Sequence, residues 1–371
     1  MVMKGRILII NPGSTSTKIG FYEDGQQKFE TNLTHSAEEI ARYESVMLQG
    51  DMRRDAIVNF LSENGVELDS IDLIMARGGL ITPIQTGVYE VTEEMREALI
   101  EGKNGVHACN LSALIADDLA ADINKMRAEK GVEGVCKAYI ADAPTSDDML
   151  PELKISGHPA FPRRPAFHTL NSRAMVRRYA RNAGKDVKNL TVIVAHMGGG
   201  SSVSLHRNGL VIDVNDALGG DGPMSPERAG SVPAFPLVDL CFSGQYTKAE
   251  VKKMLVGKGG AVAHLGTNDF REIVAKAEAG EKACADFLKA FCISVAKYIG
   301  SMATVVCGKV DAIILTGGIA YSKPITAAIT EMVQFLAPVE VLAGENELES
   351  LADNGYGILG GEFEVKTYSR G

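Results

Sequence analysis

Near the start of the chain, glycine, hydroxyl and lysine side chains form a cluster with the composition of a phosphate-binding turn. Four apolar residues, 7–10, run into "NPGSTSTK" at positions 11–18. The segment is not a Walker loop, because no second glycine precedes Lys18 and an isoleucine follows it. In an extended strand Ser14, Ser16 and Lys18 would share one face, which predicts that all three point at the same ligand.

The same order of parts recurs about half a chain later, in "VIVAHMGGGSSVSLHRNG" at 192–209. Each copy has an apolar strand, a polar residue, a small-residue turn, a second strand and a turn pair, Asp24-Gly25 or Asn208-Gly209. Such pairs favour tight hairpin turns. Two unrelated hairpins would be the simpler interpretation, but the shared order favours a repeat. It predicts two similar domains whose turns grip one polyphosphate across a cleft.

A third glycine element is "VDAIILTGGIAYS" at 310–322, where Gly317 and Gly318 end a buried strand ahead of a helical pattern. A backbone without Cβ lets a flat or charged ligand approach closely, and a helix N-terminus favours anions. Together with the two hairpins, this junction fits a site for adenosine or its phosphates.

Strand-like runs alternate with helical stretches along the chain, and this alternation predicts an α/β protein with substantial parallel sheet. Long amphipathic stretches at 110–130 and 281–308 predict helices, and "TKAE" at 247–250 is a capping box that begins another. The strand-like runs are "RILIIN", "KIGFY", "DLIMARGG", "VCKAYIAD", "LTVIVAHMGGG", "SVSLH", "VDAIILTGG" and "APVEVLAG".

Composition narrows the class of protein further. A chain of 371 residues exceeds one comfortable core, so two domains are expected. The net charge of -9 argues against a nucleic-acid partner. The six cysteines show no C-x-x-C pair and lie in apolar settings, as buried thiols of a reducing compartment do. We found no signal peptide and no apolar run of membrane length, so we expect a cytoplasmic protein without a membrane partner.

Taken together, "NPGSTSTK", "AHMGGGSSV", "LTGGIAYS" and "GENELESLADNG" resemble the acetate and butyrate kinase family of the actin-like ATPase superfamily. The matching segments spread from residue 6 to about 361, and "ARGGL", "YIAD" and "SPERAGSVP" are closer to the butyrate than to the acetate kinases. The resemblance implies two ribonuclease-H-like domains with a cleft between them. One would comprise residues 1–143 plus about 349–371, and the other about 144–348. It also implies a homo-oligomer, at least a dimer.

The family reaction moves the γ-phosphoryl group of ATP, with Mg²⁺, to a short-chain carboxylate and gives an acyl phosphate and ADP. For this chain the resemblance implies butyrate or a branched analogue such as isobutyrate. A carboxylate is already ionised at neutral pH, so no general base is required. Positioning and positive charge must do the catalytic work.

Candidate residues for that work follow from the resemblance. Arg77, at a strand end beside two glycines, would bind an oxyanion, and Arg228 corresponds to a second arginine that contacts substrate and phosphoryl group. His168 would donate to the phosphoryl oxygens, while the place of a second family histidine holds Ser172. Asp142 ends a strand and would hold Mg²⁺.

The remaining assignments concern ATP and the metal. His196 and Asn11 occupy equivalent places in the two repeats, which indicates hydrogen bonding rather than acid–base work. Glu347 is the second metal-side candidate, although "NELE" can be registered two ways and Glu349 stays an alternative. The predicted nucleotide contacts are Asn11, Ser14, Ser16, Lys18, His196, Gly198, Gly199, Gly200, Gly317 and Gly318.

Other functions are conceivable for these motifs. A non-catalytic or chaperone-type actin-like protein would need the phosphate turns but not Arg77, Arg228 and His168, and no partner-binding appendage is evident. A glucokinase-like sugar kinase or repressor is opposed by the lack of a cysteine/histidine zinc cluster and of an N-terminal DNA-binding helix pair. An acetate or propionate kinase of the same family is the nearest alternative.

Overall fold

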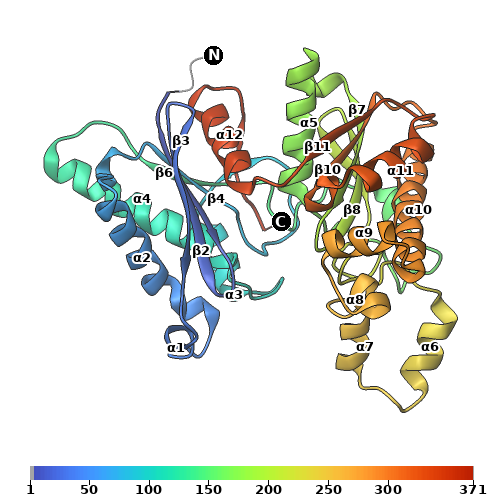
Figure 1. Ribbon diagram of the computed structural model, residues 1–371. Coiled ribbons are helices and arrows are strands. Elements are labelled where there is room, and N and C mark those ends of the chain that lie inside the picture. The colour runs from blue at the N-terminus through green and yellow to red at the C-terminus, as the bar shows by residue number, and fades with distance from the viewer. Residues whose placement is uncertain (1–3, 371) are drawn as a thin grey trace. The chain divides into compact units, whose positions relative to one another are not determined.

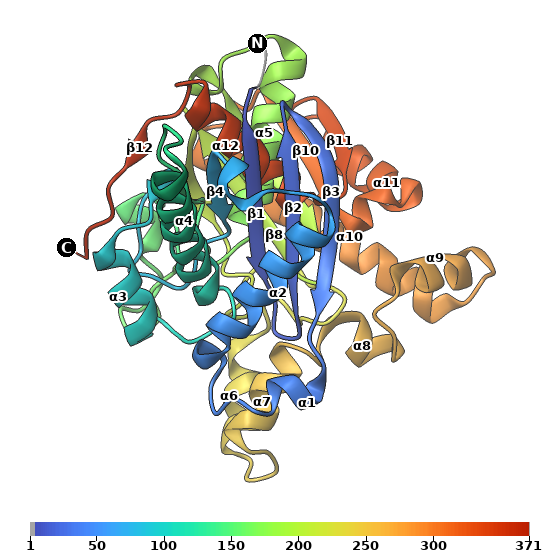
Figure 2. The same ribbon diagram turned by 90° about the vertical axis from the view of Figure 1, so that its left-hand side faces the viewer.

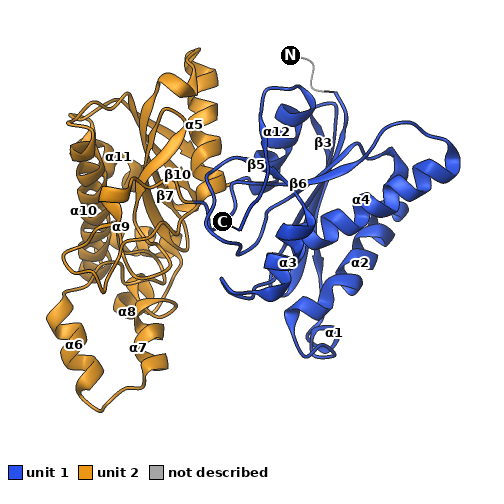
Figure 3. Cartoon of the chain, turned by 180° about the vertical axis from the view of Figure 1, so that it is seen from behind, with its two compact units in different colours: residues 1–146, 346–371 blue, residues 147–345 orange. Residues whose placement is uncertain are grey.

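The computed structural model describes residues 4–370, which divide into two compact α/β units (Figure 3). Unit 1 comprises the chain up to Ser146 and the chain from Asn346 onward, and unit 2 comprises Asp147–Glu345. The boundaries predicted from sequence, after residue 143 and before residue 349, lie three residues from these divisions. Which ligand each unit binds stays a prediction.

Unit 1 is built on a seven-stranded sheet with the order β12-β5-β6-β4-β1-β2-β3. β1 pairs parallel with β4, and β4 pairs parallel with β6, whereas β1, β2 and β3 pair antiparallel. The strands are β1 Arg6–Pro12, β2 Ser16–Glu23, β3 Gln26–Thr34, β4 Leu73–Ala76, β5 Val88–Glu90, β6 Lys137–Ala141 and β12 Val365–Lys366. The helices are α1 Ala37–Ile40, α2 Gly50–Glu63, α3 Glu93–Glu101, α4 Asn110–Lys130 and α12 Glu347–Leu359, with 3₁₀ turns η1 Val46–Gln49 and η2 Leu68–Ser70.

Helices cover both faces of this sheet, with α2 and α4 on one face and α12 on the other (Figures 1 and 2). Leu8 and Ile10 of β1 pack in the core cluster that includes α4. Gly355 of α12 lies against Ile7, on the opposite side of β1, so closely that a Cβ there would be 2.8 Å from the Ile7 Cδ1. Burial on both faces explains why β1 is a continuous apolar run rather than an alternating one.

Unit 2 repeats this plan on a five-stranded sheet with the order β11-β10-β7-β8-β9. Its strands are β7 Thr191–Met197, β8 Ser201–Arg207, β9 Leu210–Val214, β10 Ala312–Gly317 and β11 Val339–Ala343. Its helices are α5 Thr169–Ala183, α6 Ala234–Phe242, α7 Lys248–Leu255, α8 Gly260–Leu265, α9 Phe270–Glu278, α10 Lys282–Val305 and α11 Lys323–Val333, with 3₁₀ turns η3 Pro151–Lys154, η4 Val187–Asn189 and η5 Gly318–Tyr321. α5 packs on the Val192 and Val194 face of β7, whereas α10 and α11 pack on the Ile193 and Ala195 face.

The repeat predicted from sequence is present in the fold. β1-β2 and β7-β8 are antiparallel hairpins, and the turn residues Asp24 and Asn208 have positive φ values of 50° and 54°. Each turn leads into a third antiparallel strand, β3 or β9, which the sequence analysis did not recognise. β3 has no fully buried residue, so it lacks the apolar pattern by which strands are found.

Several local predictions are confirmed. The stretch expected to be helical at 110–130 is α4, and the one at 281–308 contains α10. α7 begins at the capping box, where the Glu250 N–H donates to Thr247 Oγ1 and the Thr247 N–H donates to Glu250 Oε2.

Helix α10 corrects the expectation that no segment has membrane length. Its 24 residues are long and apolar enough to cross a membrane by length and composition. Phe291, Val295 and Ile299, at helical spacing, are fully buried in the core of unit 2. A core helix of a large α/β unit is apolar for this reason, so the length of α10 is weak evidence for a membrane.

Candidate active site

In the first glycine turn, the strand assignment corrects one sequence expectation. β2 begins at Ser16, so Ser14 lies in the turn and does not share a strand face with Ser16 and Lys18. Lys18 Nζ forms an ion pair with Glu30 Oε1 on the neighbouring strand β3 at 2.6 Å. Phosphate binding by Ser14, Ser16 and Lys18 stays a prediction, with the lysine already paired on its own sheet.

At the carboxyl edge of the unit 1 sheet, three polar side chains contact one another. Asn11 Nδ2 donates to Glu347 Oε2 at 2.6 Å. Arg77, directly after β4, lies with Nη1 3.0 Å from Glu347 Oε1 and 3.2 Å from Oε2. Because Ile10 of β1 is level with Ala76 of β4, the parallel register carries Asn11 and Arg77 to the same height. These residues, far apart in sequence, form one cluster that can bind a carboxylate or phosphate.

The two glutamates left open by the sequence have different positions. Glu347 is the first residue of α12 and joins the cluster with Asn11 and Arg77. Glu349 instead lies in the first turn of the same helix, where its N–H donates to Oδ1 of the N-cap residue Asn346 at 3.0 Å and its carboxylate accepts from Asn346 Nδ2. Glu347 therefore contacts Asn11 and Arg77, whereas Glu349 bonds to Asn346, and which glutamate lies on the metal side stays a prediction.

Asp142 follows β6 at the same edge of the sheet. Ile140 pairs with Ala76, so Asp142 stands one residue beyond the height of Arg77. It is buried, its Oδ1 accepts from the Gly87 N–H at 3.0 Å, and its φ is 48°. An aspartate in this left-handed conformation at a strand end is uncommon and directs attention to the position.

The second turn, Gly198–Gly200, carries two stacked histidines beneath it. The rings of His168 and His196 are parallel, with centroids 3.7 Å apart. Asn171 Nδ2 lies 2.9 Å from His196 Nδ1, and with the amide as donor the neutral ring carries its proton on Nε2. A Cβ on Gly198 would lie 3.1 Å from that Nε2, which places the N–H directly under the turn. Burial and the charge of His168 hold the pKa of His196 well below its ordinary value, so the ring is a neutral donor.

Arg228 joins the same cluster, and its predicted contact with substrate and phosphoryl group stays a prediction. Its Nη1 donates to the Ala217 carbonyl at 2.9 Å, and its guanidinium lies so close to Gly200 that a Cβ there would collide with it. Ser225 Oγ donates to the Gly199 carbonyl at 3.0 Å, which ties the loop of Arg228 to the turn. The predicted residues His168, His196, Arg228 and Gly198–Gly200 are thus brought together in unit 2.

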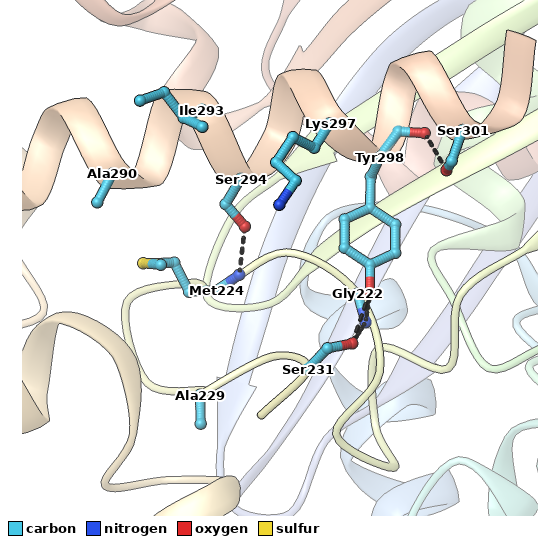
Figure 4. Close-up of a pocket in the computed structure, with 10 residues that line it drawn as sticks. All are labelled: Gly222, Met224, Ala229, Ser231, Ala290, Ile293, Ser294, Lys297, Tyr298 and Ser301. Atoms are coloured by element: carbon cyan, nitrogen blue, oxygen red, sulfur yellow. Dashed lines mark hydrogen bonds between the residues drawn. The ribbon is translucent and has the colours of Figure 1, made fainter. Parts of the chain in front are cut away.

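Helix α10 holds the back of the Arg228 loop, a role that the sequence analysis missed. The Tyr298 hydroxyl accepts from the Gly222 N–H at 3.1 Å and is 2.5 Å from Ser231 Oγ, and Ser294 Oγ accepts from the Met224 N–H (Figure 4). These contacts border a hollow of about 700 Å³ into which Lys297 projects. Ser294 and Tyr298, polar residues at helical spacing within an otherwise apolar helix, were the signal in the sequence that could have indicated these contacts.

A larger cavity of about 960 Å³ adjoins the second turn. Gly198, Gly199 and Gly318 line it, together with the 268–271 segment at the start of α9. Gly317 has φ of 86° and touches the Met197 backbone so closely that no side chain fits. The predicted adenosine loop and phosphate turn therefore share one cavity. Asn268, Asp269, Phe270 and Arg271 are further lining residues that the sequence analysis did not identify.

Comparison with known proteins shows which class this fold and site define. Residues 159–352 match the acetokinase family. Acetate kinase of Porphyromonas gingivalis superposes with a TM-score of 0.74 at 19% identity, over 96% of this chain and 100% of that one. Acetate kinase of Entamoeba histolytica gives 0.69 at 18% identity, over 94% and 98%. These likenesses confirm the expected actin-like fold.

Closer relatives narrow the assignment. Butyrate kinase 1 of Clostridium acetobutylicum is 47% identical over 363 residues, which cover 98% of this chain and 99% of that protein. A probable butyrate kinase of Bacteroides thetaiotaomicron is 44% identical over the same number of residues, with the same coverage. The chain belongs to the acetokinase family, and the resemblance read from its motifs is confirmed.

Buried histidines predict that unit 2 is sensitive to acid. Burial, and then the charges of Arg173 and Arg177, lower the pKa of His206 to about 3, against an ordinary value of 6.5. The unfolded chain therefore takes up a proton below pH 6.5 that the folded chain refuses. The contribution of neutral His206 to the free energy of unfolding is fully present above pH 6.5 and is lost as pH falls toward 3. At pH 5 the free energy of unfolding is lower by on the order of 2 kcal/mol for such a group.

Urea unfolding at pH 7.5, 6 and 5 measures this loss. His206→Gln should flatten the dependence on pH, while His264→Gln, at an exposed histidine of α8, should leave the wild-type slope. Equal slopes for wild type and His206→Gln would contradict the assignment.

Proposed function

We propose that this chain transfers the γ-phosphoryl group of ATP to the carboxylate of a short-chain fatty acid, butyrate or a branched analogue, in a reversible reaction. The observation that carries the proposal is the contact of Arg77 with both oxygens of the Glu347 carboxylate. A guanidinium held at this sheet edge is suited to a carboxylate or to a phosphoryl oxygen. The name of the 47% identical relative supports butyrate as the acceptor.

The proposed phosphoryl transfer requires the protein mainly to position the substrates and to supply positive charge. The acceptor carboxylate attacks in its ionised form, so no residue need remove a proton. Arg77 would orient it and offset its repulsion from the phosphate, and Arg228 and His168 would stabilise charge on the equatorial oxygens of the moving group. His196, a neutral Nε2 donor, would bind a phosphate oxygen without titrating near pH 7.

The nucleotide would bind unit 2 in the cavity beside Gly317 and Gly318, with its phosphates on Gly198, Gly199 and Gly200. The lining segment at Asn268–Arg271 would contact the adenosine. Asn11, Ser14, Ser16 and Lys18 of unit 1 would contact the transferring phosphoryl group.

Magnesium fits the carboxylates at the edge of the unit 1 sheet. Among residues 4–370 there is no group of three or more His, Cys, Asp or Glu side chains that could cage an ion. Mg²⁺ on a nucleotide usually takes one or two carboxylates, with phosphate oxygens and water completing its shell. Asp142, buried at the strand end, and Glu347 supply that number. When bound, the ion would neutralise charge on the phosphates.

The other functions are less well supported. An actin-like sensor or chaperone has no need of the Arg77 and Arg228 clusters described above. A putative N-acetylmannosamine kinase of Listeria monocytogenes shares the fold at a TM-score of 0.51 and 13% identity, below the acetate kinases. An acetate or propionate kinase would carry out the same reaction on a shorter acid. Burying one methylene in an apolar acyl pocket contributes only ~0.8 kcal/mol to binding, so a small change in the pocket could shift the preferred acid.

We also propose a homo-oligomer, at least a dimer, working in a reducing cytoplasm. Helix α6 has no buried residue, and Phe235, Val238 and Phe242 are 84%, 50% and 87% exposed at spacings that place them on one helix face. An apolar stripe of this kind marks a protein contact, and a second copy is the occupant proposed here. All six cysteines are free thiols, but Cys241 and Cys307 are exposed, so the expectation that all six are buried holds only for the other four.

Hydroxylamine trapping tests the proposed reaction directly. With ATP, Mg²⁺ and a panel of acetate, propionate, butyrate, isobutyrate and valerate, we expect acyl hydroxamate to form, with the highest kcat/KM for a four-carbon acid. The absence of hydroxamate with every acid would overturn the kinase assignment. A maximum at acetate or propionate would move the chain to the neighbouring activity.

Arg77→Ala should lower kcat by on the order of 10²–10³-fold, because it removes charge aimed at the reacting oxygens, while the Kd for ATP changes little. Steady-state kinetics and calorimetric titration of ATP measure the two effects. Arg6→Ala, at the opposite end of β1, is the matched control and should behave as wild type. An equal loss of ATP affinity in Arg77→Ala would instead put this arginine in the nucleotide site.

Light scattering after gel filtration measures the oligomer. The wild type should elute with at least twice the chain mass, and Phe235→Ser/Phe242→Ser should shift toward the monomer. Phe161→Ser/Phe335→Ser, at exposed phenylalanines outside α6, is the control. A monomeric wild type would contradict the proposal.

A further inference from the structure

Beneath the first glycine turn lies an arginine that neither the motifs nor the proposed chemistry uses. Arg53, in the first turns of α2, is fully buried. Its Nη1 donates to the carbonyls of Gly13 and Ser16, each at 2.9 Å, and its Nη2 donates to the carbonyl of Ser14 at 3.1 Å. One guanidinium therefore binds three carbonyl oxygens of a single tight turn.

All other donors of Arg53 are also occupied by neutral groups. Nη2 and Nε donate to Gln49 Oε1 at 2.8 and 3.2 Å, and Nη1 reaches Thr17 Oγ1 at 3.1 Å. No carboxylate in the described part of the chain forms an ion pair with it. An arginine stays protonated even when buried, so a full positive charge sits under the turn, balanced by carbonyl dipoles alone. A buried charge without a counter-ion is costly, which makes a purely structural role a poor explanation.

The contacts also decide which way the turn faces. The remaining carbonyl, that of Thr15, accepts from the His35 N–H at 2.9 Å, and His35 Nε2 lies 2.8 Å from Thr17 Oγ1. Every carbonyl from residue 13 to residue 16 is thus bound from within unit 1, with Ser16 also accepting from the Gly13 N–H. The N–H groups of Ser14 and Thr15 donate to no atom of the described chain, so they remain for an external anion.

We propose that Arg53 is the positioning residue of the first phosphate turn. It draws the carbonyls of the turn inward, leaves the N–H groups of Ser14 and Thr15 outward, and adds positive charge behind them. The turn becomes an anion site without a lysine of the Walker type and without contact between Arg53 and the substrate. This inference rests on the proposed function, since it names the device by which unit 1 binds the transferring phosphoryl group.

Arg127 offers a matched control. It is also a buried arginine of unit 1 that donates to loop carbonyls, those of Asp69 at 2.8 Å and Ile71 at 2.9 Å. These carbonyls precede β4, whereas the phosphate turn follows β1, and the two strands are parallel. Arg127 therefore does similar structural work at the amino edge of the sheet, away from the turn, and differs from Arg53 in having a carboxylate nearby, Asp72 Oδ1 at 3.7 Å from Nη2.

The experiment compares Arg53→Met, Arg53→Lys and Arg127→Met by thermal unfolding and by kcat and KM for ATP in the hydroxamate assay. Both Met variants should lose Tm. Arg53→Met should also lower kcat by on the order of 10²-fold and raise KM, because the turn loses both its direction and its charge. Arg53→Lys, which keeps the charge with fewer donors, should recover part of the activity. Arg127→Met should keep both constants within about twofold of wild type.

Each outcome decides a separate point. If Arg53→Met loses stability but keeps the kcat and KM of Arg127→Met, the positioning role is overturned and Arg53 is structural. If Arg53→Met fails to fold, Arg53→Lys carries the test, and wild-type constants in that soluble variant would overturn the need for the guanidinium fork. If the wild type itself forms no hydroxamate, the proposed function fails, and calorimetric binding of ATP to the same variants then tests the turn alone.

Discussion

The parallel register of β1, β4 and β6 is the constraint on which unit 1 depends. Ile10, Ala76 and Ile140 lie level across the three strands, so the residues that follow them reach one edge of the sheet together. Asn11, Arg77 and Asp142 come from segments separated by more than sixty residues of chain, yet each lies within two residues of the end of its strand. Ligands commonly bind at the carboxyl ends of parallel strands, because the loops that leave the sheet there form a crevice lined by polar groups.

The two repeats share the hairpin but differ in the groups that surround its glycine turn. In unit 1 the turn has a single glycine, and a buried arginine binds its carbonyls from below. In unit 2 the turn has three glycines, and the groups around it are a neutral histidine pair and Arg228. The same hairpin is thus combined with different polar groups in the two units, which indicates that the backbone arrangement does not depend on one particular set of side chains.

Two arginines beside the glycine turns are held by backbone carbonyls rather than by counter-ions. Arg53 binds carbonyl oxygens, and Arg228 binds the Ala217 carbonyl against Gly200. Carbonyl dipoles satisfy a guanidinium without cancelling its charge, whereas a carboxylate would neutralise it. Arg77 differs, because its contact with Glu347 would have to be shared with the substrate or the metal. Burial and the charge of His168 hold the pKa of His196 well below its ordinary value, so that ring stays neutral near pH 7.

Much of this protein could be read from sequence because the relevant signals are local. Apolar runs, glycine turns, the capping box at Thr247 and the spacing of 110–130 depend on near neighbours, and the strands and helices follow them. The repeat and the family resemblance came from the order of such local parts. The strand face assigned to Ser14 was wrong, because where a turn ends and a strand begins depends on the partner strand.

Only the tertiary structure could decide the contacts that join distant segments. The contact of Glu347 rather than Glu349 with Asn11 depends on which side of α12 meets β1, and the contacts of Arg53 depend on α2 lying beneath the turn. Nothing in the residues around Arg53 distinguishes it from a surface arginine, and the lining residues of α9 and the anchors on α10 are equally inconspicuous. The sequence of a segment determines its preference for helix, strand or turn. The role of a buried charge depends instead on the groups that surround it, and these come together only when the chain packs.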